Sequence, residues 1–320
     1  AARNHFNEVE KVVGIGGAHL WALGAIGANP GLGMNALARE MQVHQSTASN
    51  RVRALIERGL VRTERDETDR RAVRLSLLPA GTDLLARARP RLDALAREGV
   101  HIAVMYAQSK DQAEAVAREL TSTYQINAAA FGCDITDGAA VEALIAAVTA
   151  RFGRLDILIN DAAFNKSVPF QDLDSLTVEL WEKIMAVNLT GPMRLIKAAA
   201  PALKASGAGR IVNISSVAGL GPTGSSIAYA VSKAGLIHLT RCMAVALAPE
   251  TLVNCVAPGL LEGTRATANL RPEQIERSAA SSLLQKAADK DDCADMVVTM
   301  CRTDTMTGQT IVIDAGRIFH

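Results

Sequence analysis

The chain has 320 residues, 49% of them hydrophobic and 21% charged, which is the balance of a globular protein with two domains or one large one. No apolar run reaches the ~18 residues of a membrane span and no signal peptide stands at the start, so we expect a cytoplasmic protein without a membrane partner. The five cysteines are scattered with no Cys-x-x-Cys pair, which is typical of reduced thiols and argues against disulfides or a metal site.

The net charge of +1 is unevenly distributed along the chain. Residues 1–90 carry 13 Arg and Lys against 9 Asp and Glu, a net charge of +4, whereas the remainder carries 21 against 24, a net charge of −3. A basic first part is a weak indication of binding to nucleic acid.

Three short helices are predicted near the start, at His19–Ala28, Asn35–Gln42 and Gln45–Arg58. The turn between the second and the third is so short that the pair favours a helix-turn-helix. Within the third helix, Ile56 is expected to turn inward with its apolar neighbours. The outer face offers groups that can contact base edges and phosphates in a major groove, namely Gln45, Ser46, Ser49, Asn50 and Arg53.

Two alternating strands, Leu60–Arg65 and Ala72–Leu77, follow and enclose a polar tip, Asp-Glu-Thr-Asp-Arg-Arg. With the helices before them, they resemble the winged helix of the MarR-type regulators, including its wing pattern Asp-x-x-Asp-Arg-Arg. The resemblance implies an α+β winged-helix domain over residues 1–90, in which Arg70 or Arg71 enters a minor groove of double-stranded DNA. A winged helix used only for protein contacts is the alternative.

Strands and helices alternate over residues 91–320. The predicted strands are His101–Tyr106, Asn127–Cys133, Leu155–Asn160, Arg210–Ile214, Leu252–Val256 and Thr310–Asp314. The predicted helices are Arg91–Glu98, Lys110–Tyr124, Asp137–Phe152, Leu173–Leu203, one that starts at Ala228, and Asp291–Arg302. This alternation predicts an α/β fold with a doubly wound parallel sheet.

The segment Asn213–Lys233 contains the candidate catalytic residues. A loop with three glycines and a proline, 219–226, separates a predicted strand from a predicted helix. Tyr229 and Lys233 are four residues apart and therefore lie on one face of that helix. Ser216 leaves the end of the strand and can reach the same point from the other side.

This arrangement suits transfer of a hydride to or from a carbon that bears oxygen. The oxygen needs a proton donor or acceptor, and a phenol with its usual pKa of ~10 is too weak a base at neutral pH. The Lys233 ammonium is expected to lower the pKa of Tyr229, and Ser216 can hold the substrate oxygen. The alternative is an ordinary core helix with a surface Tyr and Lys, which the spacing and the strand–loop–helix context disfavour.

Residues ~92–320 resemble a short-chain dehydrogenase/reductase, a family with a Rossmann-type sheet. The family pattern matches at Ser216, Tyr229, Lys233 and Asn188. The resemblance implies that Asn188 holds a water in a proton relay and that Lys233 hydrogen-bonds the nicotinamide ribose. It also implies an alcohol or ketone substrate, as in a 3-oxoacyl reductase, and a homo-oligomer, either a dimer or a tetramer.

The resemblance lacks its usual beginning. Family members start with a strand and a Thr-Gly-x-x-x-Gly-x-Gly turn, whose backbone amides bind the cofactor pyrophosphate. Here the pattern begins at Leu92–Gly99, and the winged helix replaces that strand and turn. Gly14–Gly17 offers a Gly-x-Gly, but it lies ~85 residues before the second strand, whereas a βαβ unit takes ~30 residues.

Other cofactor contacts are implied by the resemblance. Asn-Asp161-Ala-Ala replaces the usual Asn-Asn-Ala-Gly, and no Asp or Glu at 106–109 is available to bind the ribose hydroxyls. Because Ser109 and Lys110 tolerate a 2′-phosphate, we expect NADP in preference to NAD. Asp134 matches the residue that contacts the adenine, and Asn160 begins the Asn-Asp-Ala-Ala motif. Pro258 and Gly259 match the loop beside the nicotinamide.

Three functions are compatible with this sequence. We favour a reductase of ketones or alcohols that carries a DNA-binding module. A MarR-like transcriptional regulator whose reductase part is catalytically impaired is the second, and an inactive fusion of two unrelated genes is the third.

Overall fold

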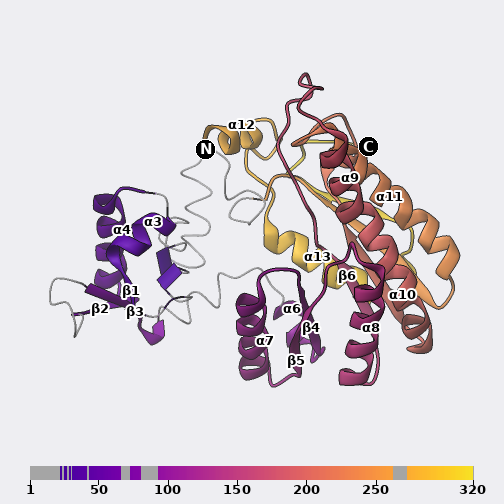
Figure 1. The fold of residues 1–320 in the computed structure, drawn as a ribbon, viewed down its shortest axis with the longest axis horizontal. Coiled ribbons are helices and arrows are strands. Elements are labelled where there is room, and N and C mark those ends of the chain that lie inside the picture. The colour runs from indigo at the N-terminus through magenta and orange to yellow at the C-terminus, as the bar shows by residue number, and fades with distance from the viewer. Residues whose placement is uncertain are drawn as a thin grey trace. The chain divides into compact units, whose positions relative to one another are not determined.

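The computed structural model describes residues 22, 23, 25, 26, 29, 31–41, 43–65, 73–80, 93–261 and 272–319. The chain divides into two compact units, Ala1–Arg89 and Pro90–His320, and Figure 1 labels the elements of both. The predicted Arg70, Arg71 and Gly14–Gly17 lie outside the described residues.

The first unit contains a helix-turn-helix and a small antiparallel sheet. Helix α3 covers Met34–Glu40 and helix α4 covers Gln45–Glu57. Strands β2 (Val61–Arg65) and β3 (Val73–Leu77) pair in antiparallel fashion, and β1 (Leu32–Gly33) adds to the other edge of β3. The sequence did not predict β1, because two residues carry too little alternation to be recognised.

Apolar side chains on one face of the two helices form the core of this unit. Leu37, Val52, Leu55 and Leu75 are at most 1% exposed and pack in one cluster. Ile56 is 39% exposed, so the expectation that it turns inward was wrong. The buried residues Ala48, Val52 and Leu55 mark the middle of the inward face, and at about 100° per residue Ile56 lies at the edge of that face.

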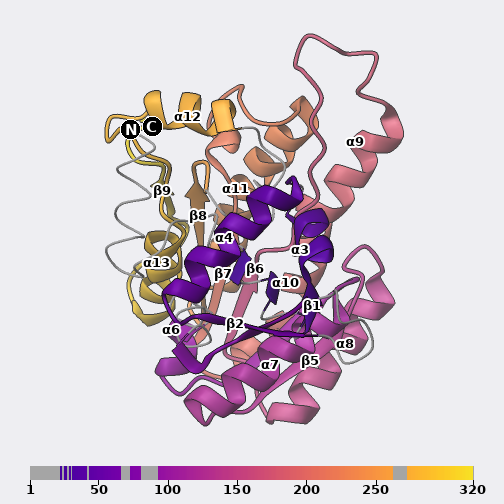
Figure 2. The same ribbon diagram turned by 90° about the vertical axis from the view of Figure 1, so that its left-hand side faces the viewer.

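The second unit contains two groups of parallel strands. Strand β4 (Ile102–Tyr106) pairs with β5 (Ala128–Gly132). Strands β6 (Ile157–Asn160), β7 (Gly209–Ile214), β8 (Thr251–Pro258) and β9 (Thr310–Ile313) form the second group in that order, as Figure 2 shows. Parallel pairing throughout confirms the predicted fold class.

Helices cover both faces of these strands (Figure 1). One face carries α6 (Asp93–Arg97), α7 (Lys110–Tyr124) and α13 (Lys290–Arg302). The other carries α8 (Gly138–Phe152), α10 (Gly191–Ala205) and α11 (Ile227–Leu247). Within the part of the chain that the structure describes, α11 is the one helix long and apolar enough to span a membrane by length and composition, and it packs on β8 in the core.

The parallel layer is interrupted between β4 and β6. Among the described residues, β4 pairs only with β5 and β6 only with β7. The two groups still share their cores, since Val104 of β4 and Ile157 of β6 pack in one cluster, and Met105 and Leu158 pack in another on the opposite face. The strands therefore lie in one layer whose hydrogen bonding is broken at this point.

Two helical regions differ from the prediction. The region predicted as Leu173–Leu203 starts as α9 (Val178–Met185), because Thr177 caps it by accepting a hydrogen bond from the Leu180 amide. A π-helical turn, Ala186–Thr190, then joins α9 to α10. A helix at Pro272–Ala280, α12, was not predicted, because its polar residues show no apolar periodicity.

Candidate active site

The candidate catalytic residues gather at the carboxyl ends of β6, β7 and β8. Ligands bind at these ends in open α/β sheets, because loops there are free to vary while the strands stay rigid. Ser216 follows β7 and caps a short 3-10 turn by accepting from the Ala218 amide at 3.2 Å. Ser226 caps α11 by accepting from the Tyr229 amide at 3.2 Å, which fixes where that helix begins.

Ser216, Tyr229 and Lys233 are brought together as the sequence predicted. The Ser216 hydroxyl lies near enough to the Tyr229 phenol to lower its pKa. The Lys233 Nζ lies 5.8 Å from the centre of the Tyr229 ring and donates a 2.8 Å hydrogen bond to the Ile214 carbonyl oxygen. Lys233 is 2% exposed, so its ammonium is held inside the protein by a strand end.

The electrostatics of this group differ from the expectation. Burial raises the pKa of Tyr229; the hydrogen bond with Ser216 opposes that rise and the Asp161 carboxylate adds to it. Burial lowers the pKa of Lys233 to about 8, against smaller raising effects of Asp161 and Cys255. The expectation that the ammonium lowers the pKa of Tyr229 was therefore wrong. The reason is that desolvation disfavours the charged forms of both groups.

The Asn188 side chain is used for structure. Its Oδ1 accepts from the Phe164 amide at 2.7 Å, and its Nδ2 donates to the Phe164 carbonyl at 3.0 Å and to the Ser232 hydroxyl at 3.1 Å. Ser232 in turn donates to the Tyr229 carbonyl at 2.8 Å. The Asn188 side chain makes all three of these bonds inside the protein. A water in the expected proton relay would therefore bind the backbone of Asn188 and not its side chain.

A buried amide network that sequence reasoning missed joins the strand ends to α11. Asn160 Nδ2 donates to Asn213 Oδ1 at 2.8 Å, and Asn213 Nδ2 donates to Thr240 Oγ1 at 2.9 Å. All three residues are at most 4% exposed. The only available signal was an asparagine at the end of an apolar strand, where a buried amide needs a partner. Asn160 Oδ1 is buried without a hydrogen-bond partner in the described structure.

The predicted adenine and 2′-phosphate residues belong to the smaller group of strands. Asp134 follows β5 and accepts from both the amide and the hydroxyl of Thr136, which lowers the pKa of its carboxyl group. Ser109 is the N-cap residue of α7, and Lys110 is exposed, 3.8 Å from Glu114. These residues lie beyond the break in the layer, whereas the catalytic residues lie on β7 and α11.

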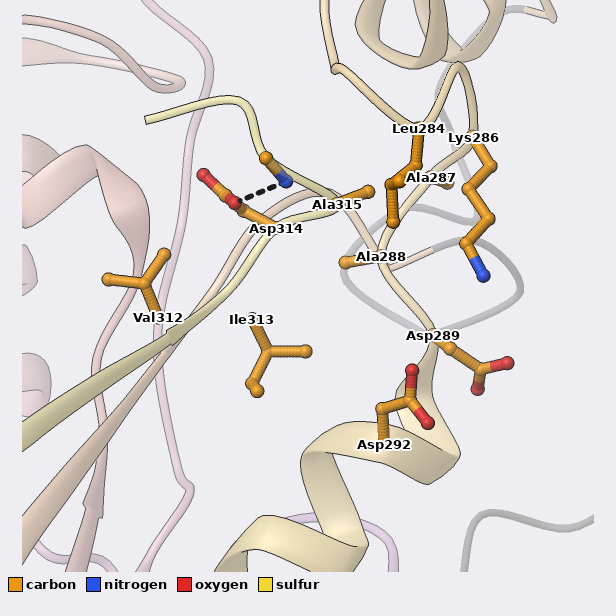
Figure 3. A pocket seen from close by; sticks show the side chains of 11 residues that line it. Leu284, Lys286, Ala287, Ala288, Asp289, Asp292, Val312, Ile313, Asp314 and Ala315 are labelled. Carbon is orange, nitrogen blue, oxygen red and sulfur yellow. Dashed lines mark hydrogen bonds between the residues drawn. The ribbon is translucent and has the colours of Figure 1, made fainter. Parts of the chain in front are cut away.

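Pro258 is the last residue of β8, and Gly259 follows it. A cavity of about 220 Å³ is lined by Asp314 and its neighbours, but not by Pro258 or Gly259. A Cβ on Gly259 would lie 2.8 Å from the Asp314 Cβ, so only glycine fits there. Figure 3 shows the Asp314 carboxylate bonded to a backbone amide, that of Gly316 at 2.9 Å, with Lys286, Asp289 and Asp292 at the other side of the cavity.

The predicted DNA-contacting residues of α4 divide into two groups. Gln45, Ser46, Asn50 and Arg53 are exposed, whereas Ser49 is half-buried. The His44 side chain caps the helix by accepting from the Ser46 amide. A polar stripe along one face of α4 is therefore accessible.

Comparison with known proteins follows this division of the chain. Residues 91–317 match the family model described as enoyl-(acyl carrier protein) reductase, and residues 13–72 match the MarR family model. The 3-oxoacyl-[acyl-carrier-protein] reductase FabG of Staphylococcus aureus is 32% identical over 229 residues, which are 69% of this chain and 89% of that protein.

Two solved structures are similar to the second unit. ElxO with NADP bound is 26% identical with a TM-score of 0.63, covering 70% of this chain and 91% of that one. NAD⁺-bound xylitol dehydrogenase is 25% identical with a TM-score of 0.62, covering 69% and 91%. The chain belongs to the short-chain dehydrogenase/reductase family of oxidoreductases, and a MarR-type winged-helix region precedes its reductase part.

Proposed function

We propose that the protein transfers a hydride between a nicotinamide cofactor and a ketone or secondary alcohol, with a 3-oxoacyl compound as the substrate class. The observation that carries this proposal is the meeting of Ser216, Tyr229 and Lys233 at the carboxyl ends of the strands. The similarity to a 3-oxoacyl reductase supports the substrate class.

Each residue has a distinct role in this proposal. The Ser216 hydroxyl holds the substrate oxygen, and the Tyr229 phenol gives its proton to that oxygen during reduction. Lys233 stabilises the phenolate that results. For this, its ammonium gives up the hydrogen bond to the Ile214 carbonyl and turns toward Tyr229. Asn188 holds the Phe164 segment and the start of α11 in place.

The residues present fit a nicotinamide cofactor in part. The orphan acceptor Asn160 Oδ1 suits an N–H or O–H donor from the cofactor, which when bound supplies or accepts the hydride. We propose that Asp134 contacts the adenine and that Pro258 and Gly259 lie beside the nicotinamide. The absence of an acid at 106–109 favours NADP, whose 2′-phosphate would meet Ser109 and Lys110.

The pyrophosphate is the part of the cofactor that lacks a partner in this proposal. The family's first strand and glycine-rich turn belong between β4 and β6, where the described residues leave both strand edges unpaired. We therefore expect weak cofactor binding and slow turnover, which keeps the catalytically impaired regulator as the rival function.

Enzyme assays decide between these functions. Purified full-length protein is titrated with NADPH and with NADH, followed by cofactor fluorescence, and then assayed with a 3-oxoacyl thioester. Saturable binding with NADPH oxidation that Tyr229→Phe abolishes is the expected result. Duplex DNA binding without any cofactor binding would overturn the reductase and support the regulator, while neither activity would support the inactive fusion.

A second function, DNA binding, is favoured by the exposed polar face of α4. Ser46, Asn50 and Arg53 lie at helical spacing along it, and such groups read base edges and phosphates. Arg70 and Arg71 are proposed to contact the minor groove. A mobility-shift assay with random duplexes at low salt tests this, and no shift at any concentration would leave a structural role.

A homo-oligomer, a dimer or a tetramer, is also proposed. Helix α11 exposes 41% of Val231 and 83% of Val245, two apolar residues on its outer surface. Sedimentation of the full chain at several concentrations measures the oligomeric state.

A further inference from the structure

Three consecutive residues bond the end of β7 to α11. The Asn213 side chain donates to Thr240 at 2.9 Å, and the Ile214 carbonyl accepts from the Lys233 ammonium at 2.8 Å. The third is Ser215, whose hydroxyl donates a 2.9 Å hydrogen bond to the backbone carbonyl oxygen of Lys233. Lys233 is therefore bonded to the end of the strand through its backbone as well as through its side chain.

Ser215 is itself fixed on the side of the sheet. It is 4% exposed, and its amide donates to the Val256 carbonyl of β8 at 2.8 Å. A carbonyl oxygen has two lone pairs, so the Lys233 oxygen can accept from this hydroxyl in addition to its bond within the helix. Loss of a buried bond of this kind leaves an acceptor that water does not reach. Ser215 thus links β8 to α11 one residue before the catalytic Ser216.

The 3-10 turn that follows Ser216 approaches the same peptide group of α11. A Cβ on Gly219 would lie 2.7 Å from the Lys233 carbonyl carbon and 2.8 Å from its oxygen. The backbone of Lys233 is therefore enclosed by the turn and by Ser215. Its side chain, in contrast, has to move in the proposed mechanism, because the ammonium gives up the Ile214 carbonyl and turns toward Tyr229.

We propose that Ser215 is a positioning residue of the active site, whose hydroxyl holds the Lys233 backbone at the end of β7 while the Lys233 ammonium moves from Ile214 to Tyr229. The inference rests on the proposed function, because the moving ammonium belongs to that mechanism. A catalytic group misplaced by about 1 Å can lower a rate by about 10²-fold. When the ammonium leaves Ile214, the bonds from Asn213 and Ser215 remain, so the helix keeps its place while the side chain moves.

The first test is turnover of a 3-oxoacyl thioester with NADPH by full-length variants. Ser215→Ala removes the hydroxyl and should lower kcat by about tenfold, with a KM for the thioester within about twofold of that of the parent protein. Ser215→Cys keeps a side chain of similar size but offers only a weak donor, so it should lower kcat as Ser215→Ala does. A parental kcat in Ser215→Cys would overturn the proposal, because packing rather than the hydrogen bond would then be what matters. A change confined to KM would also overturn it.

Thr149 provides a matched control. Its hydroxyl donates to the Ile145 carbonyl at 2.8 Å within α8, a helix that carries none of the candidate catalytic residues. Thr149→Val breaks the same kind of bond with little change in side-chain size and should leave kcat unchanged. A kcat that falls equally in Thr149→Val and Ser215→Ala would overturn the positioning role.

Hydrogen exchange of the full-length protein without cofactor is the second test, and it requires no turnover. Ser215→Ala should speed amide exchange in residues 230–237 of α11 and leave residues 241–247 unchanged, since these follow the intact bond to Thr240. Exchange in 230–237 that is no faster than in Thr149→Val would overturn the inference. If no preparation turns over, the proposed function fails, while the exchange rates still decide whether Ser215 holds α11.

Discussion

Lys233 Nζ donates a 2.8 Å hydrogen bond to the Ile214 carbonyl oxygen and is thereby buried between α11 and the end of β7. Burial of an ammonium with a backbone oxygen as its described acceptor is costly, and it lowers the lysine pKa from its usual 10.5 to about 8. The ammonium of Lys233 is therefore unfavourable at this buried position, where the proposed mechanism uses its charge.

The first prediction is a dependence of stability on pH that Lys233 causes. Between pH 8 and 10.5 the unfolded lysine binds a proton that the folded one has lost, so stability rises with pH across this window. The contribution is complete above the unfolded pKa and lost as the pH falls through the folded pKa, and it reaches up to about 3 kcal/mol.

Urea unfolding of the protein and of Lys233→Met at about pH 7.5 and about pH 9.5 measures this contribution. The free energy of unfolding should rise by about 2 kcal/mol more in the parent protein than in the variant. Cys255, whose pKa burial raises to about 11, acts in the opposite direction in both proteins and largely cancels. Equal pH dependence in the two proteins would contradict a lowered lysine pKa.

The second prediction concerns the phenol of Tyr229. Tyr229→Phe removes only the phenolic oxygen, so turnover should fall to background while circular dichroism stays unchanged. Lys233→Ala should lower turnover and weaken NADPH binding as well. An unchanged kcat in Tyr229→Phe would remove this residue from the mechanism.

The third prediction concerns the close approach of Gly219 to α11. A Cβ on Gly219 would lie 2.7 Å from the Lys233 backbone carbon and 2.8 Å from the Ala234 nitrogen, neither of which can move without the helix. Gly219→Ala should therefore lower stability by about 1–3 kcal/mol and lower kcat, because α11 and its lysine are displaced. Gly221→Ala is the matched control, since its Cβ would meet nothing within 4 Å. Equal thermal midpoints for the two variants would contradict the tight contact.

The fourth prediction separates DNA contact from general charge. Arg53→Ala should weaken duplex binding by about 1–3 kcal/mol if the guanidinium touches a base, or reduce the salt slope by about one unit if it touches phosphate. Arg71→Ala should behave in the same way. Arg118→Ala, on α7 of the other unit, changes the net charge equally and should leave binding unaffected. The three variants are compared by fluorescence anisotropy at several salt concentrations.

The sequence was sufficient where local spacing decides position. The spacing of four residues on one helix predicted that Tyr229 lies beside Lys233. Helix α7 also has the predicted bounds, Lys110–Tyr124. Contacts between distant segments could not be predicted, because strand register decides them. The pairing of Asn160 with Asn213, 53 residues apart, is of this kind. The raised pKa of Tyr229 was missed because desolvation depends on packing that spacing does not reveal.

The fifth prediction arises from the break between β4 and β6. An open strand edge leaves amide and carbonyl groups without ladder partners, so it should exchange its amide hydrogens faster than a strand paired on both sides. β6 pairs only with β7 in the described residues, and its first three residues are half-buried, whereas β8 is buried along nearly its whole length. We therefore expect faster hydrogen exchange in Ile157–Asn160 than in Thr251–Pro258, as measured by mass spectrometry.

Closing the break should also provide a pyrophosphate site of the kind that the family's first turn forms. A chimera in which a strand and a Thr-Gly-x-x-x-Gly-x-Gly turn replace residues 1–91 would place a parallel strand between β4 and β6, and its amides would meet the pyrophosphate charge. NADPH should bind this chimera more tightly than the parent chain by several kcal/mol, since two or three charge-assisted hydrogen bonds are regained, and exchange in β6 should slow. A chimera with the same strand but alanines in place of the turn glycines controls for closure alone and should slow exchange without the gain in affinity. Low-micromolar NADPH binding by the parent chain would contradict the prediction and show that another segment supplies the phosphate amides, with Gly14–Gly17 the first to be substituted.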